Sequence, residues 1–407
     1  MKSILLRLLP LVLICSSLQW SCSNEIDVIG EWKEIPVVYG IFTTAPQGVI
    51  NYFRIEKAFL DPNTDAFEIA QRPDSLYYGE NEIEVLLYER VNASGYPDEF
   101  IVIDTLERVD AATLGFQREE GIFSGSPNYI YVSESNAPTT NADERYRYYK
   151  LVIHNNVSGR TFTQRCIGLK PGNFDNTEQA YPEFKVINPA RSRPVRWAHR
   201  DPITDEWIQD DVRFNWLRPY NGTIYDLSIR IEYFEFEVDA NQPNEPEIPG
   251  TRVLKEITWT PSRNLIAEGN VEKVERFDEF FYEFTEVNGG GVAQEINGAN
   301  FYNFLKNNLS DITDTNVRRC LSQTFDIRVD AAGPELSEYI RARNSNQNLL
   351  GGLFPSDPFS NVEDGYGIFC HKLFVTKLDM NWDSDVFEYM RFGEITQGLG
   401  FRDVGCN

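Results

Sequence analysis

Short segments that alternate apolar and polar residues fill the first half of the chain and constrain its fold more than any other feature. Residues 50–60 place Tyr52, Arg54 and Glu56 between apolar positions, which is the period-two pattern of a half-buried strand. Further strand segments occupy residues 35–42, 82–91, 100–109, 129–132, 145–154 and 160–169. Short strands separated by polar turns favour an antiparallel sandwich. We therefore expect a mainly β fold that begins with an Ig-like antiparallel sandwich at residues 35–172.

A polar, turn-rich stretch at residues 170–182 ends this series and predicts a domain boundary. Beyond it, Asn221-Gly222 joins two strand-like segments, which is a strong hairpin signal. Strand segments continue at residues 211–216, 223–238, 252–260, 271–287, 321–329 and 366–378. Apolar stripes at helical spacing predict two short helices at residues 298–309 and 334–343. The second domain, residues 183–407, is therefore expected to be β-rich with two helical insertions.

The charge balance narrows the classes of partner. The chain has 62 Asp and Glu residues against 38 Lys and Arg, which gives a formal net charge of −24 at pH 7. A nucleic-acid binder that works through a basic surface is excluded, because attraction to phosphates needs an excess of Lys and Arg. The 27 Phe and 20 Tyr residues suit half-buried strands better than helical bundles.

The N-terminus has the features of an export signal. Residues 1–21 combine a basic start with a short apolar stretch and a small residue before Cys22. The apolar stretch is too short to span a bilayer, which takes about 20 residues. We therefore predict a lipoprotein signal peptide at residues 1–21, acylation of Cys22 and an anchor or linker at residues 22–34. Cys15 is the competing lipidation site, and an ordinary secretory signal is the simpler alternative.

Six motifs are spread over nearly the whole chain after the signal. They are PVVYGIF (36–42), YFRIEKAFL (52–60), PDSLYY (73–78), FNWLRPYNGTIYDLSIRIEY (214–233), GPELSEYI (333–340) and SNVEDGYGIF (360–369). In sequence and order, this series resembles an uncharacterised family of Bacteroidota outer-membrane lipoproteins. The resemblance implies a β-sandwich followed by a second β-rich domain, and a gene often placed beside a TonB-dependent receptor. No catalytic residues are established for that family, so the resemblance implies none here.

Four cysteines remain after the signal: Cys166, Cys320, Cys370 and Cys406. In an oxidising compartment an even count permits two disulfides, with three possible pairings. We hypothesise that Cys370 pairs with Cys406, because their separation of 36 residues is the shortest available. His371 follows Cys370 directly, but adjacent side chains of a strand point to opposite faces, so a catalytic thiol dyad is not expected.

A cluster of arginines stands out in this acidic chain. Its members, a candidate binding patch, are Arg191, Arg193, Arg196, Trp197 and Arg200. Arginine binds carboxylates and phosphates through paired N–H groups and stacks on aromatic rings. One interpretation is a contact patch for an anionic partner or a glycan. The other is charge pairing with the chain's own acidic residues, such as Asp201, Asp205 and Glu206.

Motifs for other chemistry are weak. The acidic loop at residues 239–247 offers oxygen ligands for calcium, although acidic loops that contain proline are more often solvated turns. The sequence contains no GxSxG motif and no phosphate-binding glycine loop. We therefore assign no catalytic residues, no metal ligands and no cofactor.

The function expected from these features is non-enzymatic binding at the outer membrane. The chain would act as an accessory or ligand-binding subunit of an outer-membrane protein complex, with a TonB-dependent transporter as the candidate. It would reach the membrane through acylated Cys22, on the cell-surface or the periplasmic face, and bind no nucleic acid. The alternative is a carbohydrate-active hydrolase or glycan-binding protein with an acidic cleft, because 62 acidic residues offer many carboxylate pairs.

Overall fold

The computed structural model describes most of the chain beyond its N-terminal segment. The described residues are 33–44, 48–58, 65–91, 99–119, 121–134, 147–169, 184–219, 221–242, 245–266, 271–276, 279–284, 292–314, 316–347 and 359–402. The predicted signal peptide, Cys22 and the predicted boundary at residues 170–182 lie outside these ranges. Within them, no helix has the length and apolar character needed to cross a bilayer.

The fold is mainly β, as the sequence predicts, and an eight-stranded sheet is its largest element. In spatial order the strands are β14 (Val253–Ile266), β13 (Ile224–Glu237), β18 (Val317–Ala332), β19 (Tyr366–Asn381), β1 (Pro36–Phe42), β2 (Ile50–Lys57), β6 (Tyr129–Glu134) and β5 (Glu107–Asp110). Neighbouring strands are antiparallel except β1 and β19, which are parallel.

Smaller sheets and short helices complete the described structure. A four-stranded sheet has the order β4 (Glu99–Thr105), β3 (Ile83–Val91), β7 (Arg147–Asn155) and β8 (Thr161–Gly168). A three-stranded sheet has the order β17 (Val292–Asn297), β12 (Asp211–Trp216) and β9 (Val186–Asn188). Two antiparallel pairs are β10 (Ala198–Arg200) with β11 (Trp207–Gln209), and β15 (Val271–Arg276) with β16 (Glu279–Phe284). The helices are α2 (Ala66–Ala70), α3 (Pro73–Leu76), α4 (Gly298–Asn308), α5 (Pro334–Gln347), α6 (Ser384–Phe392) and the 3₁₀ turns η1 (Ala111–Leu114) and η2 (Gln397–Leu399).

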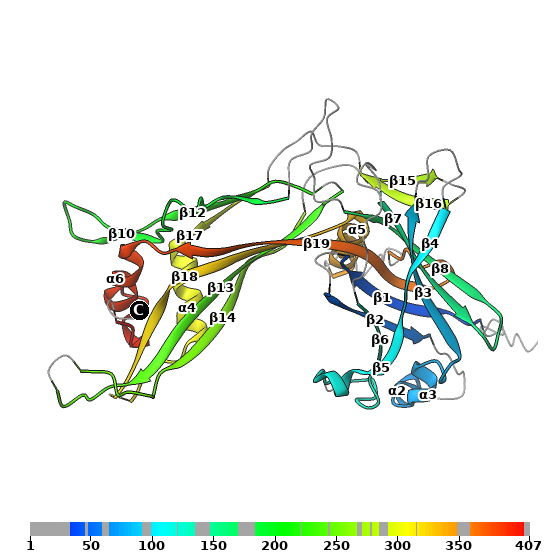
Figure 1. Ribbon diagram of the computed structural model, residues 1–407, viewed down its shortest axis with the longest axis horizontal. Helices are drawn as coiled ribbons and strands as arrows, with labels where there is room; N and C mark the ends of the chain where they lie inside the picture. Colours follow the sequence, from blue (N-terminus) through cyan, green and yellow to red (C-terminus); the bar gives the residue numbers. More distant parts are fainter. Residues whose placement is uncertain are drawn as a thin grey trace, which may run out of the picture.

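The long strand β19 joins two lobes and crosses the middle of the molecule in Figure 1. We call β1–β8 with α2 and α3 the N-terminal lobe, and β9–β14, β17, β18, α4 and α6 the C-terminal lobe. Residues 366–371 of β19 pair with β1, and residues 372–381 pair with β18. Strands from both halves of the chain therefore share one sheet, and α5 lies beside the junction (Figure 1).

Gly367 permits the close parallel pairing of β1 and β19. Its φ angle is +116°, and a Cβ atom at this position would lie 1.9 Å from the carbonyl oxygen of Val38. Only glycine adopts this conformation without a steric penalty. Two residues further, Phe369 stacks on Phe42 of β1 with ring centroids 5.0 Å apart, which anchors the pair in the core of the N-terminal lobe.

The N-terminal lobe has two layers around one core. The four-stranded sheet and the β1–β2–β6 part of the large sheet both contribute buried side chains to it, with Phe53, Tyr131 and Leu151 as examples. The single strand expected at residues 100–109 is in fact two strands, since β4 belongs to one layer and β5 to the other. One continuous segment of the chain therefore supplies an edge strand to each of the two sheets.

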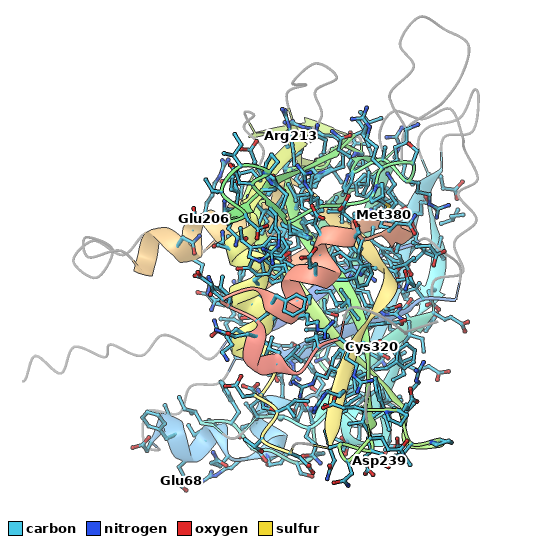
Figure 2. The ribbon with its side chains drawn as sticks, turned by 90° about the vertical axis from the view of Figure 1, so that its left-hand side faces the viewer. Glu68, Glu206, Arg213, Asp239, Cys320 and Met380 are labelled. Atoms are coloured by element: carbon cyan, nitrogen blue, oxygen red, sulfur yellow. The ribbon has the colours of Figure 1, made fainter. Side chains whose placement is uncertain are left out.

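The C-terminal lobe is built around α4 and a core rich in Trp and Tyr. The long strands β13 and β18, the three-stranded sheet and both helices α4 and α6 contribute to this core, in which Met380 is fully buried. Figure 2 faces this lobe, with α6 in front of the strands. The sequence predicts α4 correctly but misses α6, which begins where the Asp383 carboxylate accepts a hydrogen bond from the N–H of Asp385 at 3.1 Å.

Candidate functional site

The arginine cluster does not form one surface patch. Trp197 is fully buried and stacks on Phe301 of α4, with ring centroids 4.8 Å apart and planes 10° apart. The indole therefore belongs to the core of the C-terminal lobe and cannot contact a ligand at the surface. The prediction that Trp197 lines a binding patch is wrong, because a segment rich in arginine contributes one apolar side chain to the interior.

Two of the four arginines pair with carboxylates of the chain itself. Arg196 Nε lies 2.8 Å from a carboxylate oxygen of Asp210, and Arg200 lies 3.1 Å from Asp205 and 3.0 Å from Glu388. The Arg200 guanidinium also lies 4.8 Å from the ring centroid of Trp207. These contacts are those of the internal charge-pairing interpretation.

The other two arginines, Arg191 and Arg193, are exposed, and neither forms an ion pair with a described residue. They remain as a small basic surface on an acidic protein. Because Trp197 is buried and the other two arginines are paired, this surface offers fewer groups that could stack on a ligand or bind an anion through paired N–H groups than the whole cluster would.

Cys370 forms no disulfide, which contradicts its predicted pairing with Cys406; Cys406 itself lies outside the described residues. Cys166 and Cys370 are free, fully buried thiols, and burial raises the pKa of both well above its usual value. Cys320, labelled in Figure 2, is the disulfide-bonded cysteine among the described residues. Cys370 lies on the part of β19 that pairs with β1, opposite Ile41, and its side chain is fully buried. Separation along the chain was therefore a poor guide to proximity.

His371 is held in a structural role beside these thiols. Its Nδ1 accepts a hydrogen bond from the N–H of Leu169 at 2.9 Å, and its Nε2 lies 3.1 Å from the hydroxyl of Thr44. Because Nδ1 is an acceptor, the neutral ring carries its proton on Nε2, which donates to Thr44. The ring also stacks on Tyr149, with centroids 5.0 Å apart.

Glu335, in the first turn of α5, is a buried acid at the junction of the lobes. Its side chain is fully buried, and its Oε1 accepts a hydrogen bond from the N–H of Ile167 in β8 at 2.8 Å. Its Oε2 has no hydrogen-bond partner within the described part of the chain. Burial raises the pKa of Glu335 to about 8, although the bond from Ile167 opposes this shift. The carboxyl group is therefore mostly protonated at neutral pH.

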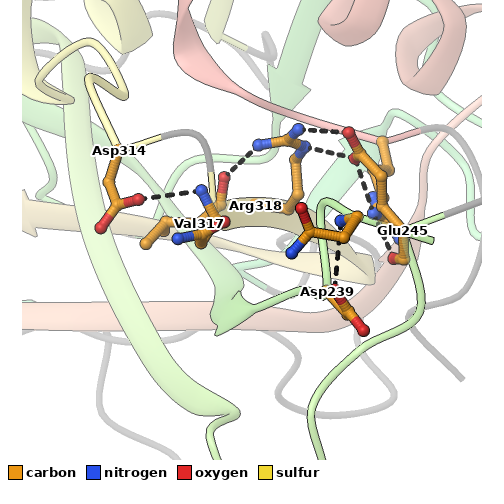
Figure 3. A network of polar contacts seen from close by, with 8 residues as sticks. Asp239, Glu245, Asp314, Val317 and Arg318 are labelled. Carbon is orange, nitrogen blue, oxygen red and sulfur yellow. Dashed lines mark hydrogen bonds and ion pairs between the residues drawn. The ribbon is translucent and has the colours of Figure 1, made fainter.

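The acidic loop that was a candidate calcium clamp is occupied by the protein's own basic groups (Figure 3). Glu245 accepts two hydrogen bonds from Arg318, at 2.8 and 2.6 Å, and a third from Arg402 at 3.0 Å. These bonds, chiefly those from Arg318, lower the pKa of Glu245. Asp239 accepts hydrogen bonds from the backbone of Asn241 and the side chain of Gln242. In the described part of this loop, the carboxylates of Asp239 and Glu245 are therefore bound by groups of the protein itself.

An open cleft in the C-terminal lobe is the best candidate for a binding site. Its volume is about 380 Å³, and it lies between β14, β17 and α4. The lining residues are Trp259, Thr260 and Pro261 of β14, Gln294, Glu295 and Ile296 of β17, and Asn300, Asn303, Phe304 and Asn307 of α4. We call it the amide-lined cleft, because four of these ten side chains end in a carboxamide.

The spacing of asparagines on α4 creates one wall of the cleft. Residues three and four apart lie on the same face of a helix, so Asn300, Asn303 and Asn307 form one row. Phe301 and Leu305 lie on the opposite face and are fully buried in the core. The helix thus divides its residues between a packed side and an amide-bearing side.

The start of α4 is fixed by tight contacts with neighbouring segments. The Asn297 side chain accepts a hydrogen bond from the N–H of Ala299 at 2.9 Å and caps the helix. The N–H of Gly298 donates to the carbonyl of Asp210 at 2.8 Å. A Cβ at Gly298 would lie 1.8 Å from the carbonyl oxygen of Trp197, so only glycine fits here. The amide row is therefore presented by a rigidly docked helix.

The polar groups of the cleft are largely free to bind a ligand. Asn300, Asn303, Asn307 and Glu295 make no side-chain hydrogen bond or ion pair with any described residue. Asn308, on the same helix but outside the cleft, instead donates to the carbonyl of Phe304 at 2.8 Å. Phe304 adds an aromatic wall, since it stacks on Trp259 with centroids 5.5 Å apart and planes 22° apart.

The sequence contained a signal for this site that charged and catalytic motifs do not capture. The same helical spacing that predicted the apolar stripe of residues 298–309 also places three asparagines in a row. The contributions from β14 and β17 had no comparable signal. Neither a scan of the sequence against protein-family models nor a search of curated proteins finds a match, so the interpretation of the cleft depends on its own geometry.

Proposed function

We propose that this protein is a lipid-anchored outer-membrane protein that acts by binding, as an accessory or ligand-binding subunit of an outer-membrane complex. The export signal and Cys22 support the anchor, and the resemblance to Bacteroidota outer-membrane lipoproteins supports the complex, with a TonB-dependent transporter as the candidate. The two predicted domains and the Ig-like character of the first belong to the same proposal. On this account the two lobes project from the membrane on the linker at residues 22–34.

The amide-lined cleft is the single observation that carries the binding function. Specific ligand sites combine apolar walls with a few polar groups that converge on the ligand. Here Phe304 and Trp259 supply the wall, and amides that lack partners among the described residues supply the polar groups.

The composition of the cleft favours binding over glycoside hydrolysis at this place. Hydrolysis needs two carboxylates that flank the scissile bond at roughly 5–10 Å from one another. Among the described residues that line the cleft, Glu295 is the carboxylate and the other polar groups are amides or a hydroxyl. Amides orient hydroxyl groups and backbone groups, but they do not transfer protons near neutral pH.

Affinity purification of the tagged full chain from native membranes tests this proposal. We expect a stoichiometric outer-membrane protein to accompany the wild-type chain. The Cys22→Ala variant should leave the membrane fraction and lose that partner. A chain that purifies alone and cleaves glycans would support the hydrolase alternative. A Cys22→Ala variant that remains membrane-bound and normally processed would contradict the predicted anchor.

A further inference from the structure

We infer that the amide-lined cleft binds a neutral oligosaccharide, which hydrogen-bonds to the row Asn300, Asn303 and Asn307. This inference rests on the proposed binding function and specifies its ligand class. Each side-chain amide presents two N–H donors and one carbonyl acceptor. A sugar hydroxyl likewise both donates and accepts, so two neighbouring hydroxyls can hydrogen-bond to the N–H and the carbonyl of one amide. Three of the unpaired side chains of the cleft, Asn300, Asn303 and Asn307, are amides of this kind.

The charge of the cleft excludes anionic ligands. Among the described lining residues there is no Lys, Arg or His, and Glu295 adds a negative charge. The whole chain carries a formal charge of −24, so the surrounding field also repels anions. Phosphate, sulfate and uronate groups are recognised in proteins by Arg, Lys and helix N-termini. The row begins at Asn300 in the first turn of α4, and Asn303 and Asn307 lie further along the helix. Its three side chains are uncharged amides, so an uncharged ligand suits the row.

The length of the row indicates a ligand of more than one sugar ring. From Asn300 to Asn307 the helix advances seven residues, or about 10 Å at 1.5 Å per residue. Three amides over this length would reach hydroxyls on successive rings of an extended chain. A single ring would leave one end of the row without a partner.

The aromatic wall and the amide row favour a sugar over a peptide. Pyranose rings carry C–H groups on their faces, which pack against aromatic rings such as Phe304. A peptide would most simply extend the edge of a sheet through its backbone. β14 is an edge strand, but Pro261 lies at the cleft and has no N–H to donate. Pro261 thus interrupts peptide pairing along β14. β17 is also an edge strand at the cleft, so the preference for a sugar comes from the aromatic wall and the exposed amides of α4.

Calorimetric titration of the full chain, extracted in detergent, tests the inference with three sets of probes. These are neutral malto-, manno- and xylo-oligosaccharides, their sulfated or uronate counterparts, and a pool of unstructured peptides. We expect one neutral series to bind, with affinity that rises from one to three sugar units. Asn303→Ala should weaken this binding by about tenfold or more, because it removes hydrogen bonds at the centre of the row. Asn308→Ala is the matched control and should bind as the wild type does.

Several outcomes would overturn the inference. Tighter binding of the charged oligosaccharides, neutral binding that Asn303→Ala leaves unchanged, or no binding of any sugar would each contradict it. Peptide binding that depends on Asn303 would refute the sugar while leaving the proposed ligand-binding function intact. Failure of every probe, together with no co-purifying membrane partner, would refute the inference and the proposed function.

Discussion

Replacement of Glu335 by glutamine should make the protein more stable at neutral and alkaline pH. The pKa of Glu335 is raised from 4.5 to about 8 because the side chain is fully buried. Between these values the native state keeps a proton that the unfolded chain releases. The contribution of this group to stability is therefore complete below pH 4.5 and falls as the pH rises toward 8.

The size of the effect follows from the shift. One pH unit within this window costs about 1.4 kcal/mol, so the loss should reach about 3 kcal/mol at pH 7 and level off at about 5 kcal/mol above pH 8. The Glu335→Gln side chain would imitate the protonated acid, since it keeps an oxygen that accepts from Ile167 and cannot ionise. The free energy of unfolding of the variant should therefore exceed that of the wild type by these amounts as the pH rises.

Urea unfolding between pH 5.5 and 9, followed by tryptophan fluorescence, measures this difference directly. Glu338→Gln is the matched control, because Glu338 lies on the same helix and pairs with Arg341 near the surface. It should change stability by less than about 1 kcal/mol at every pH. Parallel stability curves for the wild type and Glu335→Gln would show that the carboxyl titrates alike in the folded and unfolded chains and would refute this reasoning.

Three further predictions follow from the described contacts. Arg196→Glu should destabilise the protein by about 1 kcal/mol, whereas Arg193→Glu should stay within about 0.5 kcal/mol, as thermal melts can show; equal effects would contradict the assignment of the ion pair. Gly367→Ala should cost about 3 kcal/mol or more in denaturant unfolding, and a neutral result would mean that β1 and β19 do not pair as described. Peptide mapping under non-reducing conditions should find Cys320 bridged to Cys406. The other cysteines are excluded as partners because Cys166 and Cys370 are free thiols, Cys22 would be acylated, and Cys15 would be removed with the signal peptide. A free Cys320 would contradict this prediction.

The alternation of apolar and polar residues predicted much of the secondary structure, because the buried face of a strand or helix repeats every few residues. The strand at residues 211–216 and helix α4 appear where alternation and the apolar stripe placed them. The parallel pairing of β1 with β19 could not be read in this way, since its partners lie more than 300 residues apart. This pairing depends on Gly367, where a side chain would collide with the backbone of Val38. The need for glycine is therefore apparent only when the two strands lie next to each other.

The candidate site was hard to predict because its signal was neither charged nor catalytic. A row of asparagines on one helix face carries no obvious chemistry until β14 and β17 enclose it. Conversely, the arginine cluster stands out through its contrast with an acidic chain. In the structure Trp197 packs inside and Arg196 and Arg200 are paired, so the same residues mainly stabilise the lobe.

Native mass spectrometry of the full chain purified from its own membranes tests the central claim most directly. If the amide-lined cleft is the binding site, the wild type and Asn308→Ala should retain an added mass that Asn303→Ala has lost. The measurement needs no prior choice of ligand. A mass beyond that of the acylated chain that all three proteins retain equally would place binding elsewhere and contradict the account.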